Sequence, residues 1–493
     1  MENVLIIDVI AQWIFVICAT YYMITNLQWY NYSVKRVVCM HHKYMWHIYY
    51  CVLPLVVYVV AFFIPSPQGN YMLIALSVIY ALMMAIWNFK LDKRLNFTPR
   101  VIRFSVIFLI FMVFNEVLCH ILGVASTLLD LIPPLVALVV SRIYENTLLN
   151  RYIALAKEKL DIMSRLMIIC VTGSYGKTSI KNFLSQILKE KYRVYATPRS
   201  VNTHTGIVAD INANLDYTTE IYIAEAGARL KGDIALIAEF LNPHYAVIGE
   251  IGEQHLEYFK SLDNIVETKY ELLQSTRLKK AFIFKDNPKP PNMQTNMTKK
   301  FVFFPENIRN VVSDLNGIKF ELYIKEQWYE FATMILGRFN VINLSAAIYM
   351  GIELGLRVED IQKAVSRLEP IPHRLNKIQT NQKLILDDSF NGNLKGMKEA
   401  IRLSSLYNGR KIIVTPGIVE SSKEANIELA KAIDGVFDIA IITGELNSKL
   451  LCKHIHNAQK IVLKDKSMLE DMLKSCSLPQ DLVLFSNDAP SYI

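Results

Sequence analysis

The sequence predicts an α-helical membrane domain followed by two α/β domains with parallel sheets. Three observations lead to this fold class. The first 145 residues carry apolar segments close to the roughly 20 residues that cross a bilayer. A strand-like run near residue 170 then leads through a glycine-containing turn into a helix. From there short apolar runs alternate with helical patterns, which is the rhythm of βαβ units.

Composition agrees with a membrane part. Apolar residues make up 52% of the 493 residues and charged residues only 20%, and about three domains are expected at this length. The net charge of +8 suits nucleic acid or cytoplasmic loops of a membrane protein. Because no nucleic-acid-binding module is present, we favour the second cause. The seven cysteines form no C-x-x-C pair, which predicts reduced, structural thiols and no zinc site.

Residues 1–145 are expected to form a polytopic membrane domain of about five helices. The apolar segments are Val4–Thr25, Trp46–Ile64, Tyr71–Asn88, Phe104–Leu122 and Val124–Ser141. The loops after the first and third segments are basic, whereas the loop at 65–70 carries no charge. The positive-inside rule then places the N-terminus outside and the remainder of the chain in the cytoplasm. The start lacks the basic region and cleavage site of a removable signal peptide.

Three acids, Asp8, Glu116 and Asp130, fall within these segments, toward the outer side. Intramembrane acids are functional candidates, for example for contact with a lipid or a partner. The alternative is that they lie near the interface and reach water. We expect the second.

The phosphate-binding motif follows a strand-like run at 167–172. Gly173 and Gly176 let backbone N–H groups approach phosphate oxygens, and the helix N-terminus adds partial positive charge. Lys177 can reach the β- and γ-phosphates of ATP, and the Thr178 hydroxyl can hold Mg²⁺. A plain strand-turn-helix corner would not explain this order of residues. The predicted ATP contacts in this stretch are Thr172, Gly173, Ser174, Tyr175, Gly176, Lys177, Thr178 and Ser179.

The domain limits follow from these patterns. Residues 146–166 are a mixed-charge linker helix, 167–370 a P-loop-type parallel-sheet ATPase domain, and 371–493 a Rossmann-like α/β domain. The further predicted strands are Ile221–Ala224, Tyr245–Gly249, Ala281–Phe284, Leu384–Leu386, Lys411–Val414, Ile439–Ile442 and Leu482–Phe485.

Two strand ends carry candidate metal ligands. Glu225 ends a strand and precedes glycine, where open α/β sheets bind ligands, so it is a natural second Mg²⁺ ligand. His255 follows another strand and a glycine-rich loop, and could ligate a metal or contact phosphate. A loop histidine is more often a surface residue, but its place after Glu225 favours function.

Other positions are less specific by themselves. Lys269 lies on an ordinary charged helix face, and Asn343 follows a glycine stop at a helix start, where it could read an adenine edge. The run 387–393 supplies paired acids, Ser389 and two Asn, which suits a sugar or a peptide as well as a polar loop.

Together and in this order, residues 167 to about 420 resemble the Mur ligase family. The phosphate loop of this chain has the short T-G-x-x-G-K-T-S form of that family, with Val171 where the generic G-x-x-x-x-G-K-S/T pattern has glycine. The runs Glu225–Arg229 and Asp387–Asn393 most resemble its MurF-type branch, which joins D-alanyl-D-alanine to the UDP-N-acetylmuramoyl tripeptide. The resemblance implies Thr178, Glu225 and His255 around Mg²⁺; Asn343, Arg374 and Asp388 on ATP; Lys177, His255 and Lys269 in catalysis; and Asn202, Thr203, Asn391 and Asn393 on the substrates.

The implied reaction is ADP-forming amide ligation in peptidoglycan precursor synthesis. ATP phosphorylates the terminal carboxylate of the tripeptide, and the dipeptide amine displaces phosphate. The protein would position the reactants and offset their charge. Lys269 matches a lysine that is carbamylated in several members. The implied location is the bacterial inner membrane, with contact to the membrane machinery of cell-wall synthesis as a further expectation and no nucleic acid as partner.

Several positions depart from the family pattern. Members usually carry Asn where Glu250 stands, His where Phe339 stands and Pro where Leu394 stands, and a Lys-Gly-Ser-Arg stretch in place of 485–488. Membrane segments also stand where a small soluble domain usually holds UDP. The alternatives are therefore another membrane-bound ligase of the family, acting on polyglutamate or a lipid-linked precursor, and a membrane scaffold with an inactive nucleotide domain. The intact residues of the phosphate loop argue against the scaffold.

Overall fold

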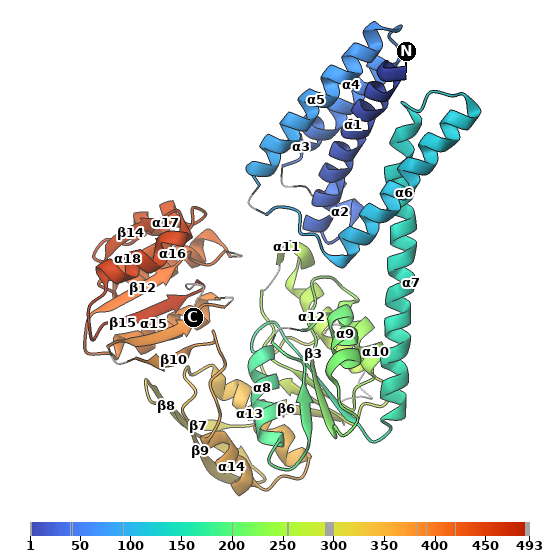
Figure 1. Cartoon of the computed structure of the whole chain (residues 1–493). Coiled ribbons are helices and arrows are strands. Elements are labelled where there is room, and N and C mark those ends of the chain that lie inside the picture. Colours follow the sequence, from blue (N-terminus) through green and yellow to red (C-terminus); the bar gives the residue numbers. More distant parts are fainter. Residues whose placement is uncertain are drawn as a thin grey trace. The chain divides into compact units, whose positions relative to one another are not determined.

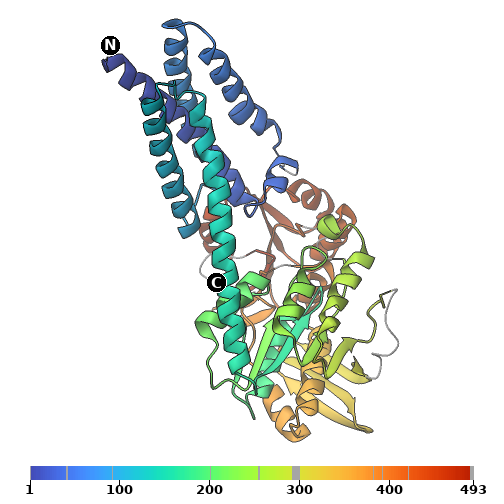
Figure 2. The ribbon, with the colours of Figure 1, turned by 90° about the vertical axis from the view of Figure 1, so that its right-hand side faces the viewer.

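The computed structural model describes residues 2–39, 41, 43–91, 93–199, 201–253, 256–290, 300–380, 382–390, 392–419 and 421–488. The chain divides into two compact units, Met1–Arg151 and Tyr152–Ile493. Unit 1 is built of helices and unit 2 is α/β, as Figures 1 and 2 show. A helical part and an α/β part, in the order that the sequence predicts, are therefore both present.

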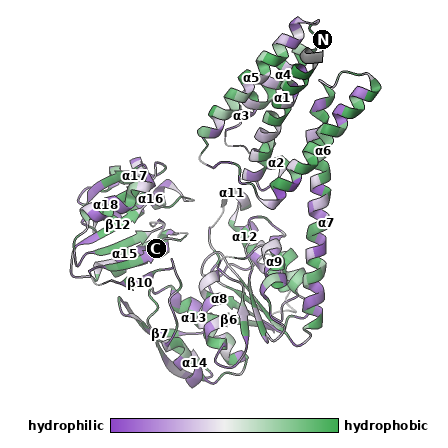
Figure 3. Cartoon of the chain, in the orientation of Figure 1, coloured by the Kyte–Doolittle hydropathy of each residue, from purple (hydrophilic) through white to green (hydrophobic). Residues whose placement is uncertain are grey.

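Unit 1 is a set of helices that change from apolar to charged along the chain. Its elements are α1 Glu2–Trp29, α2 Val34–Cys39, α3 Met45–His47, the π-helix η1 Ile48–Val52, α4 Leu53–Phe62, α5 Gln68–Phe89, α6 Pro99–Leu122, the 3₁₀ turn η2 Leu129–Leu131 and the first part of α7 Ile132–Ile162. Figure 3 shows hydrophobic residues over α1 and α4 to α6 and a mixed pattern along α7.

Four helical stretches in the described residues are long and apolar enough to cross a membrane: Ile6–Trp29, Met45–Phe62, Gln68–Phe89 and Pro99–Leu122. The fifth predicted segment, Val124–Ser141, is not among them. Its first residues form a turn that ends at η2, and the rest begins α7, which continues into the charged sequence predicted as a separate linker. The expected five spans thus become four candidates and one long helix.

Two of the acids in the apolar segments, Asp8 and Asp130, make hydrogen bonds to asparagine side chains. Asp130 is fully buried and accepts a hydrogen bond from Asn115 Nδ2 at 2.8 Å. Asp8 accepts one from Asn70 Nδ2 at 2.7 Å. The expectation that these acids reach water is wrong for Asp130, which lies in the turn η2 between α6 and α7 and is buried there.

The central sheet of unit 2 has six parallel strands in the order β2-β3-β1-β4-β5-β6. They are β1 Met167–Thr172, β2 Val194–Ala196, β3 Ile221–Glu225, β4 Tyr245–Ile248, β5 Lys280–Phe284 and β6 Phe301–Phe304. Strand order reverses around β1, so its carboxyl end lies between those of β3 and β4. This is where open parallel sheets bind ligands.

Helices cover both faces of this sheet, since successive residues of β1 enter different cores. Ile169 packs with α8 and α13, whereas Ile168 packs with α9, α10 and the end of α7. The helices and 3₁₀ turn are α8 Lys177–Leu188, α9 His204–Asn214, α10 Asp233–Leu241, α11 Leu256–Phe259, α12 Leu262–Tyr270, η3 Glu271–Gln274, α13 Asn340–Glu353 and α14 Val358–Ser366. Ala156 of α7 is fully buried here, and Lys159 Nζ donates to Ile211 O at 2.9 Å.

Two further sheets complete unit 2. An antiparallel sheet contains β7 Ile308–Asp314, β8 Gly317–Ile324 and β9 Gln327–Thr333. A six-stranded sheet has the order β10-β11-β15-β12-β13-β14, in which only β10 is antiparallel. Its elements and helices are β10 Asn376–Gln379, β11 Leu384–Asp388, α15 Leu394–Ser405, β12 Lys411–Thr415, α16 Lys423–Asp434, β13 Ile439–Thr443, α17 Ser448–His454, β14 Gln459–Leu463, η5 Lys466–Met468, α18 Leu469–Cys476 and β15 Leu482–Ser486.

Candidate active site

The predicted phosphate loop lies between β1 and α8, and glycine is needed at both of its turns. Gly173 has φ +148° and Gly176 has φ +74°. A Cβ on Gly173 would stand 3.2 Å from Gly249, and one on Gly176 would stand 2.2 Å from Asn343 Oδ1. The loop is thus held closely between the residues that follow β4 and the first turn of α13, and larger side chains have no room at these positions.

Asn343 therefore supports the loop from behind. Its Nδ2 donates to Asn340 Oδ1 at 2.9 Å, and the side chain is almost fully buried against Gly176. The adenine-reading role that the sequence suggests for Asn343 stays a prediction.

Lys177 begins α8 and turns back over its own loop. Its Nζ donates to Gly173 O and to Ser174 O, both at 2.9 Å. Burial lowers the pKa of this ammonium, Glu225 opposes the shift, and Arg374 adds to it. A positive charge is thus held inside a loop of backbone amides, an arrangement that suits a phosphate group.

Glu225, at the end of β3, collects the polar groups beside the loop. Its Oε2 accepts from Thr178 Oγ1 at 3.0 Å and its Oε1 accepts from Asn202 Nδ2 at 3.1 Å. The carboxylate is 1% exposed. Lys181 Nζ lies 3.4 Å from Glu225 Oε2. The sequence did not reveal Lys181 as a site residue, because a lysine four residues after Lys177 resembles an ordinary helix residue.

A Mg²⁺ ion fits the chemistry of this cluster. Thr178 and Glu225 supply hard oxygen ligands side by side, and Mg²⁺ in nucleotide sites typically uses one or two such groups with phosphates and water. His255, the third predicted ligand, lies outside the described residues. Within the described part of the chain, no three His, Cys, Asp or Glu side chains come together closely enough to hold a metal by themselves.

The predicted substrate residues Asn202 and Thr203 lie next to this cluster. Asn202 O accepts from Gly227 N at 2.7 Å, and its side chain faces Glu225. Thr203 is the N-cap of α9, with its Oγ1 accepting from Gly206 N at 3.2 Å. The Thr203 hydroxyl therefore caps its own helix. Asn202 instead connects this segment to Glu225, the candidate metal ligand.

Lys269 of α12 is 4% exposed. Burial, and secondly the nearby Lys177, lower the pKa of its amine to about 7. Nothing in the local sequence separates it from an exposed helix lysine, so only the packing of α12 reveals this environment.

Replacing Lys269 with methionine is expected to stabilise the protein most below pH 7. The unfolded lysine has a pKa of about 10.4, so between about pH 7 and 10 the unfolded state holds a proton that the folded state lacks. The amount by which Lys269 lowers the free energy of unfolding is thus largest below pH 7 and decreases as pH rises. Thermal unfolding of both proteins across this range measures it, and a difference that does not change with pH would contradict the buried neutral amine.

Arg374 and Asp388 come from the C-terminal part of unit 2. Asp388 Oδ1 accepts from Leu375 N at 3.1 Å. Burial raises the pKa of this carboxyl to about 6, and Arg374 opposes the shift. The guanidinium of Arg374 lies 4.5 Å from the centre of the Phe390 ring, and burial lowers its pKa while Asp388 and Glu225 oppose this. Arg374 thus shares the electrostatic environment of both Asp388 and Glu225.

Two predicted peptide contacts have different outcomes. Asn393 is the N-cap of α15 and accepts from Gly396 N at 2.9 Å. Asn391 lies outside the described residues. Beside them, His373 Nδ1 lies 2.9 Å from Asp387 Oδ2, and Ser389 Oγ donates to Asp387 Oδ1 at 2.6 Å.

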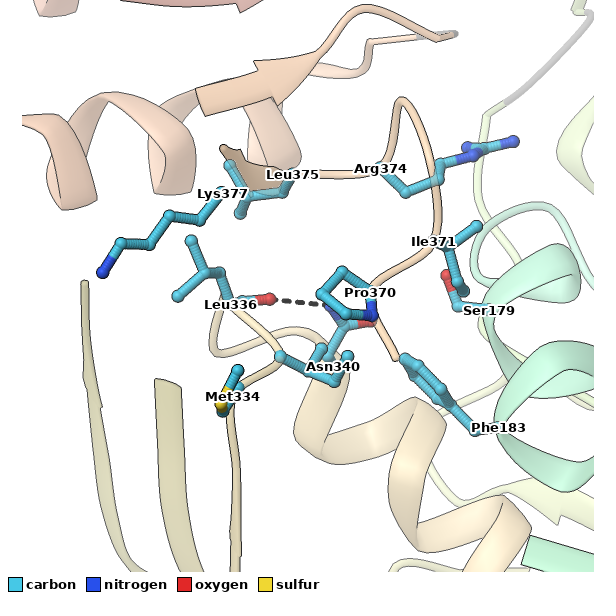
Figure 4. A pocket seen from close by; sticks show the side chains of 11 residues that line it. Ser179, Phe183, Met334, Leu336, Asn340, Pro370, Ile371, Arg374, Leu375 and Lys377 are labelled. Atoms are coloured by element: carbon cyan, nitrogen blue, oxygen red, sulfur yellow. Dashed lines mark hydrogen bonds between the residues drawn. The ribbon is translucent and has the colours of Figure 1, made fainter. Parts of the chain in front are cut away.

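Two hollows adjoin this site. The smaller lies between α8 and the segment before β10 (Figure 4), and its volume of about 10 Å³ is near the lower limit for one water molecule. The larger is an open groove of about 1640 Å³. Its basic and aromatic lining residues are Tyr175, Arg229, Tyr258, Arg338, Phe339, Lys395, Lys398 and Arg402.

Comparisons with known proteins agree with this geometry. A family model described as the Mur ligase middle domain matches residues 171–351. The UDP-N-acetylmuramoyl-tripeptide--D-alanyl-D-alanine ligase of Bacillus subtilis is 31% identical over 333 residues, which are 64% of this chain and 72% of that protein.

Solved structures show the same fold. A MurF crystal structure from Acinetobacter baumannii has a TM-score of 0.61 at 22% identity, covering 68% of this chain and 77% of that one. The MurF ligase of Thermotoga maritima, in complex with ADP, has a TM-score of 0.57 at 23% identity, covering 69% and 80%. The resemblance predicted from the phosphate loop and the strand-end residues is confirmed, and the chain belongs to the Mur ligase family.

Proposed function

We propose that this chain is an ATP-dependent, ADP-forming ligase that joins D-alanyl-D-alanine to the UDP-N-acetylmuramoyl tripeptide in peptidoglycan precursor synthesis. One observation carries the chemistry: Lys177, Thr178 and Glu225 gather at the carboxyl end of a parallel sheet, beside a large groove lined by residues of both charges. The names of the relatives supply the substrates. In this proposal the first α/β part is a P-loop-type ATPase domain at 167–370 and the second a Rossmann-like domain at 371–493.

The residues act mainly by positioning and by offsetting charge. Lys177 and the loop amides bind the phosphates of ATP, and Arg374 and Asp388 approach the nucleotide from the C-terminal part. Thr178 and Glu225, with His255, would hold Mg²⁺, which would supply positive charge to offset that of the reacting anions. Lys269, whose burial favours the neutral amine, is the candidate for carbamylation, because carbamate formation requires an uncharged nitrogen.

The reaction balances as a transfer followed by a displacement. The γ-phosphoryl group passes from ATP to the acceptor carboxylate, leaving ADP, and the dipeptide amine then forms the amide as phosphate departs. Arg229 and Arg338 line the groove and would contact an anionic acceptor, whereas the lining residues Lys395, Lys398 and Arg402 pair with glutamates. Asn202, Thr203, Asn391 and Asn393 belong to the segments that meet the substrates. Closure around the groove would protect the acyl phosphate from water.

The proposed location is the bacterial inner membrane, with the catalytic part in the cytoplasm. Four helices of unit 1 are candidates to cross the bilayer. The basic connections after the first and third of them support a cytoplasmic side for these loops. The fourth candidate then ends on the outer side, so a cytoplasmic catalytic part requires the apolar start of α7 to return the chain across the bilayer. Contact with the membrane machinery of cell-wall synthesis is part of the same proposal.

Phosphate release by the detergent-purified full-length protein tests the function. With ATP and Mg²⁺ present, we expect release only when D-alanyl-D-alanine and the UDP-linked tripeptide are added together, with one pentapeptide formed for each phosphate. The two single additions are the controls. A protein that binds ATP but releases no phosphate with both substrates would contradict the proposal, and its four apolar helices would then favour a lipid-linked acceptor or polyglutamate.

A further inference from the structure

Lys181 is a buried cation that the proposed chemistry does not use. It lies one helical turn after Lys177 on α8, and its side chain is fully excluded from solvent. Its Nζ donates to Thr197 O at 2.7 Å and to Arg199 O at 2.6 Å, and lies 3.4 Å from Glu225 Oε2. Removing an ammonium from water is costly, so three oxygen partners around one buried lysine form a specific polar site.

Two of these partners belong to the connection between β2 and α9. This connection turns sharply, because Arg199 has a φ of +44°, a conformation that non-glycine residues rarely adopt. Its carbonyls at 197 and 199 both point toward the ammonium of Lys181. The lysine therefore fixes the path of the connection from the side of the nucleotide helix.

The same connection reaches Glu225 by a second route. Glu225 N donates to Thr197 Oγ1 at 3.2 Å, and Asn202 Nδ2 donates to Glu225 Oε1 at 3.1 Å. Asn202 also packs tightly on Gly227, where an added Cβ would lie 2.7 Å from the Asn202 side chain. The Glu225 carboxylate is thus held on one oxygen by Asn202 and on the other by Thr178, with Lys181 beside it.

We propose that Lys181 is a positioning residue that fixes both the Glu225 carboxylate and the Asn202 segment, so that the Mg²⁺ ligand and the acceptor side of the site are set together. The inference rests on the proposed function for the identity of the acceptor, whereas the link to Glu225 rests only on the contacts given above. A lysine suits this role because its three N–H donors match three acceptors in different directions.

The test compares Lys181→Met with Lys189→Met in the full-length protein. Lys189 lies exposed at the C-terminal end of the same helix, so its replacement controls for the loss of a lysine. For Lys181→Met, we expect the Mg²⁺ concentration for half-maximal nucleotide binding to rise about tenfold, the effect of losing one charged hydrogen bond. Binding of ADP without Mg²⁺ should change less than about threefold, and KM for the tripeptide should rise.

A structural role alone predicts a different pattern. If the melting temperature falls while the Mg²⁺ dependence and the tripeptide KM stay as in the wild type, the proposal is overturned. Should Lys181→Met fail to fold, Lys181→Gln, which keeps one polar group, is measured in the same way. A double-mutant cycle with Asn202→Ala should show non-additive effects on Mg²⁺ dependence, and additive effects would count against the link.

The nucleotide-binding readout separates this inference from the proposed function. A wild-type protein that makes no pentapeptide would contradict the function, yet the Mg²⁺ dependence of ADP binding would still report on Lys181. A wild-type Mg²⁺ dependence in Lys181→Met, in a protein that does make pentapeptide, would reject the inference alone.

Discussion

Replacing Lys177 with methionine is expected to lower kcat by about 1,000-fold while changing the melting temperature little. Among the described residues, the Lys177 ammonium donates to two carbonyls of its own loop, Gly173 O and Ser174 O. Because these acceptors belong to a loop that is also held by backbone bonds to Glu250 O, the fold does not depend on the lysine. In the proposed function, by contrast, binding of the ATP phosphates depends on Lys177, because it places a positive charge among the amides of the loop.

Phosphate release and thermal unfolding measure the two parts of this prediction. Lys189→Met is the matched control, because it removes a lysine from the exposed end of the same helix and should leave kcat unchanged. A Lys177→Met protein with more than about a tenth of the wild-type kcat would exclude Lys177 from the transition state.

Glu225→Gln is expected to lower kcat at least about 100-fold and to raise the Mg²⁺ requirement, in a protein that still folds. The substitution keeps the size of the side chain but removes the negative charge that Mg²⁺ needs. An NH₂ group also replaces one carboxylate oxygen, and this group cannot accept the hydrogen bond that Thr178 or Asn202 donates to that oxygen. Lys181 retains its two carbonyl partners, so we expect only a modest fall in melting temperature.

Glu239→Gln is the control variant, because Glu239 is an exposed carboxylate on α10, a helix that packs on the same central sheet. Titration with Mg²⁺ at saturating ATP distinguishes a lost metal ligand from general damage. Wild-type activity and an unchanged Mg²⁺ titration in Glu225→Gln would remove Glu225 from the metal site.

The parts of the fold that sequence patterns identify are those buried on both faces. Strands β1, β3 and β4 are continuous apolar runs because helices cover both sides of the sheet, and each was predicted within a residue or two. The antiparallel strands β7 to β9 were missed, because polar residues of their exposed face alternate with the buried apolar ones and leave no continuous apolar run.

The fifth membrane segment shows a different limit. Apolar content at 124–141 predicts one helix, but Ser126 and Thr127 bond to Gln12 of α1 and interrupt it. This interruption depends on contacts with a distant helix, which local hydropathy does not include. The same limit applies to Asp130, whose burial follows from the folded connection.

Sequence reasoning placed Lys177, Thr178 and Glu225 near one another because motif residues and strand ends occupy fixed places in an open parallel sheet. Lys181 could not be found this way. A lysine at this spacing usually lies on the solvent side of a helix, and only the sharp connection at Arg199 brings acceptors to it. The burial of Lys269 depends in the same way on helix packing.

The backbone bonds between the phosphate loop and Glu250 bear on which substitutions the family tolerates. Ser174 N and Tyr175 N both donate to Glu250 O, so the cradle requires a carbonyl at this position and no particular side chain. Glutamate can therefore replace the asparagine usual in the family without disturbing the loop. The Glu250 carboxylate instead pairs with Lys395 at 2.8 Å. Lys395 directly follows Leu394, which stands in place of the usual proline. A change of side chain at residue 250 would thus alter the contact to α15 and leave the two backbone hydrogen bonds to the loop in place.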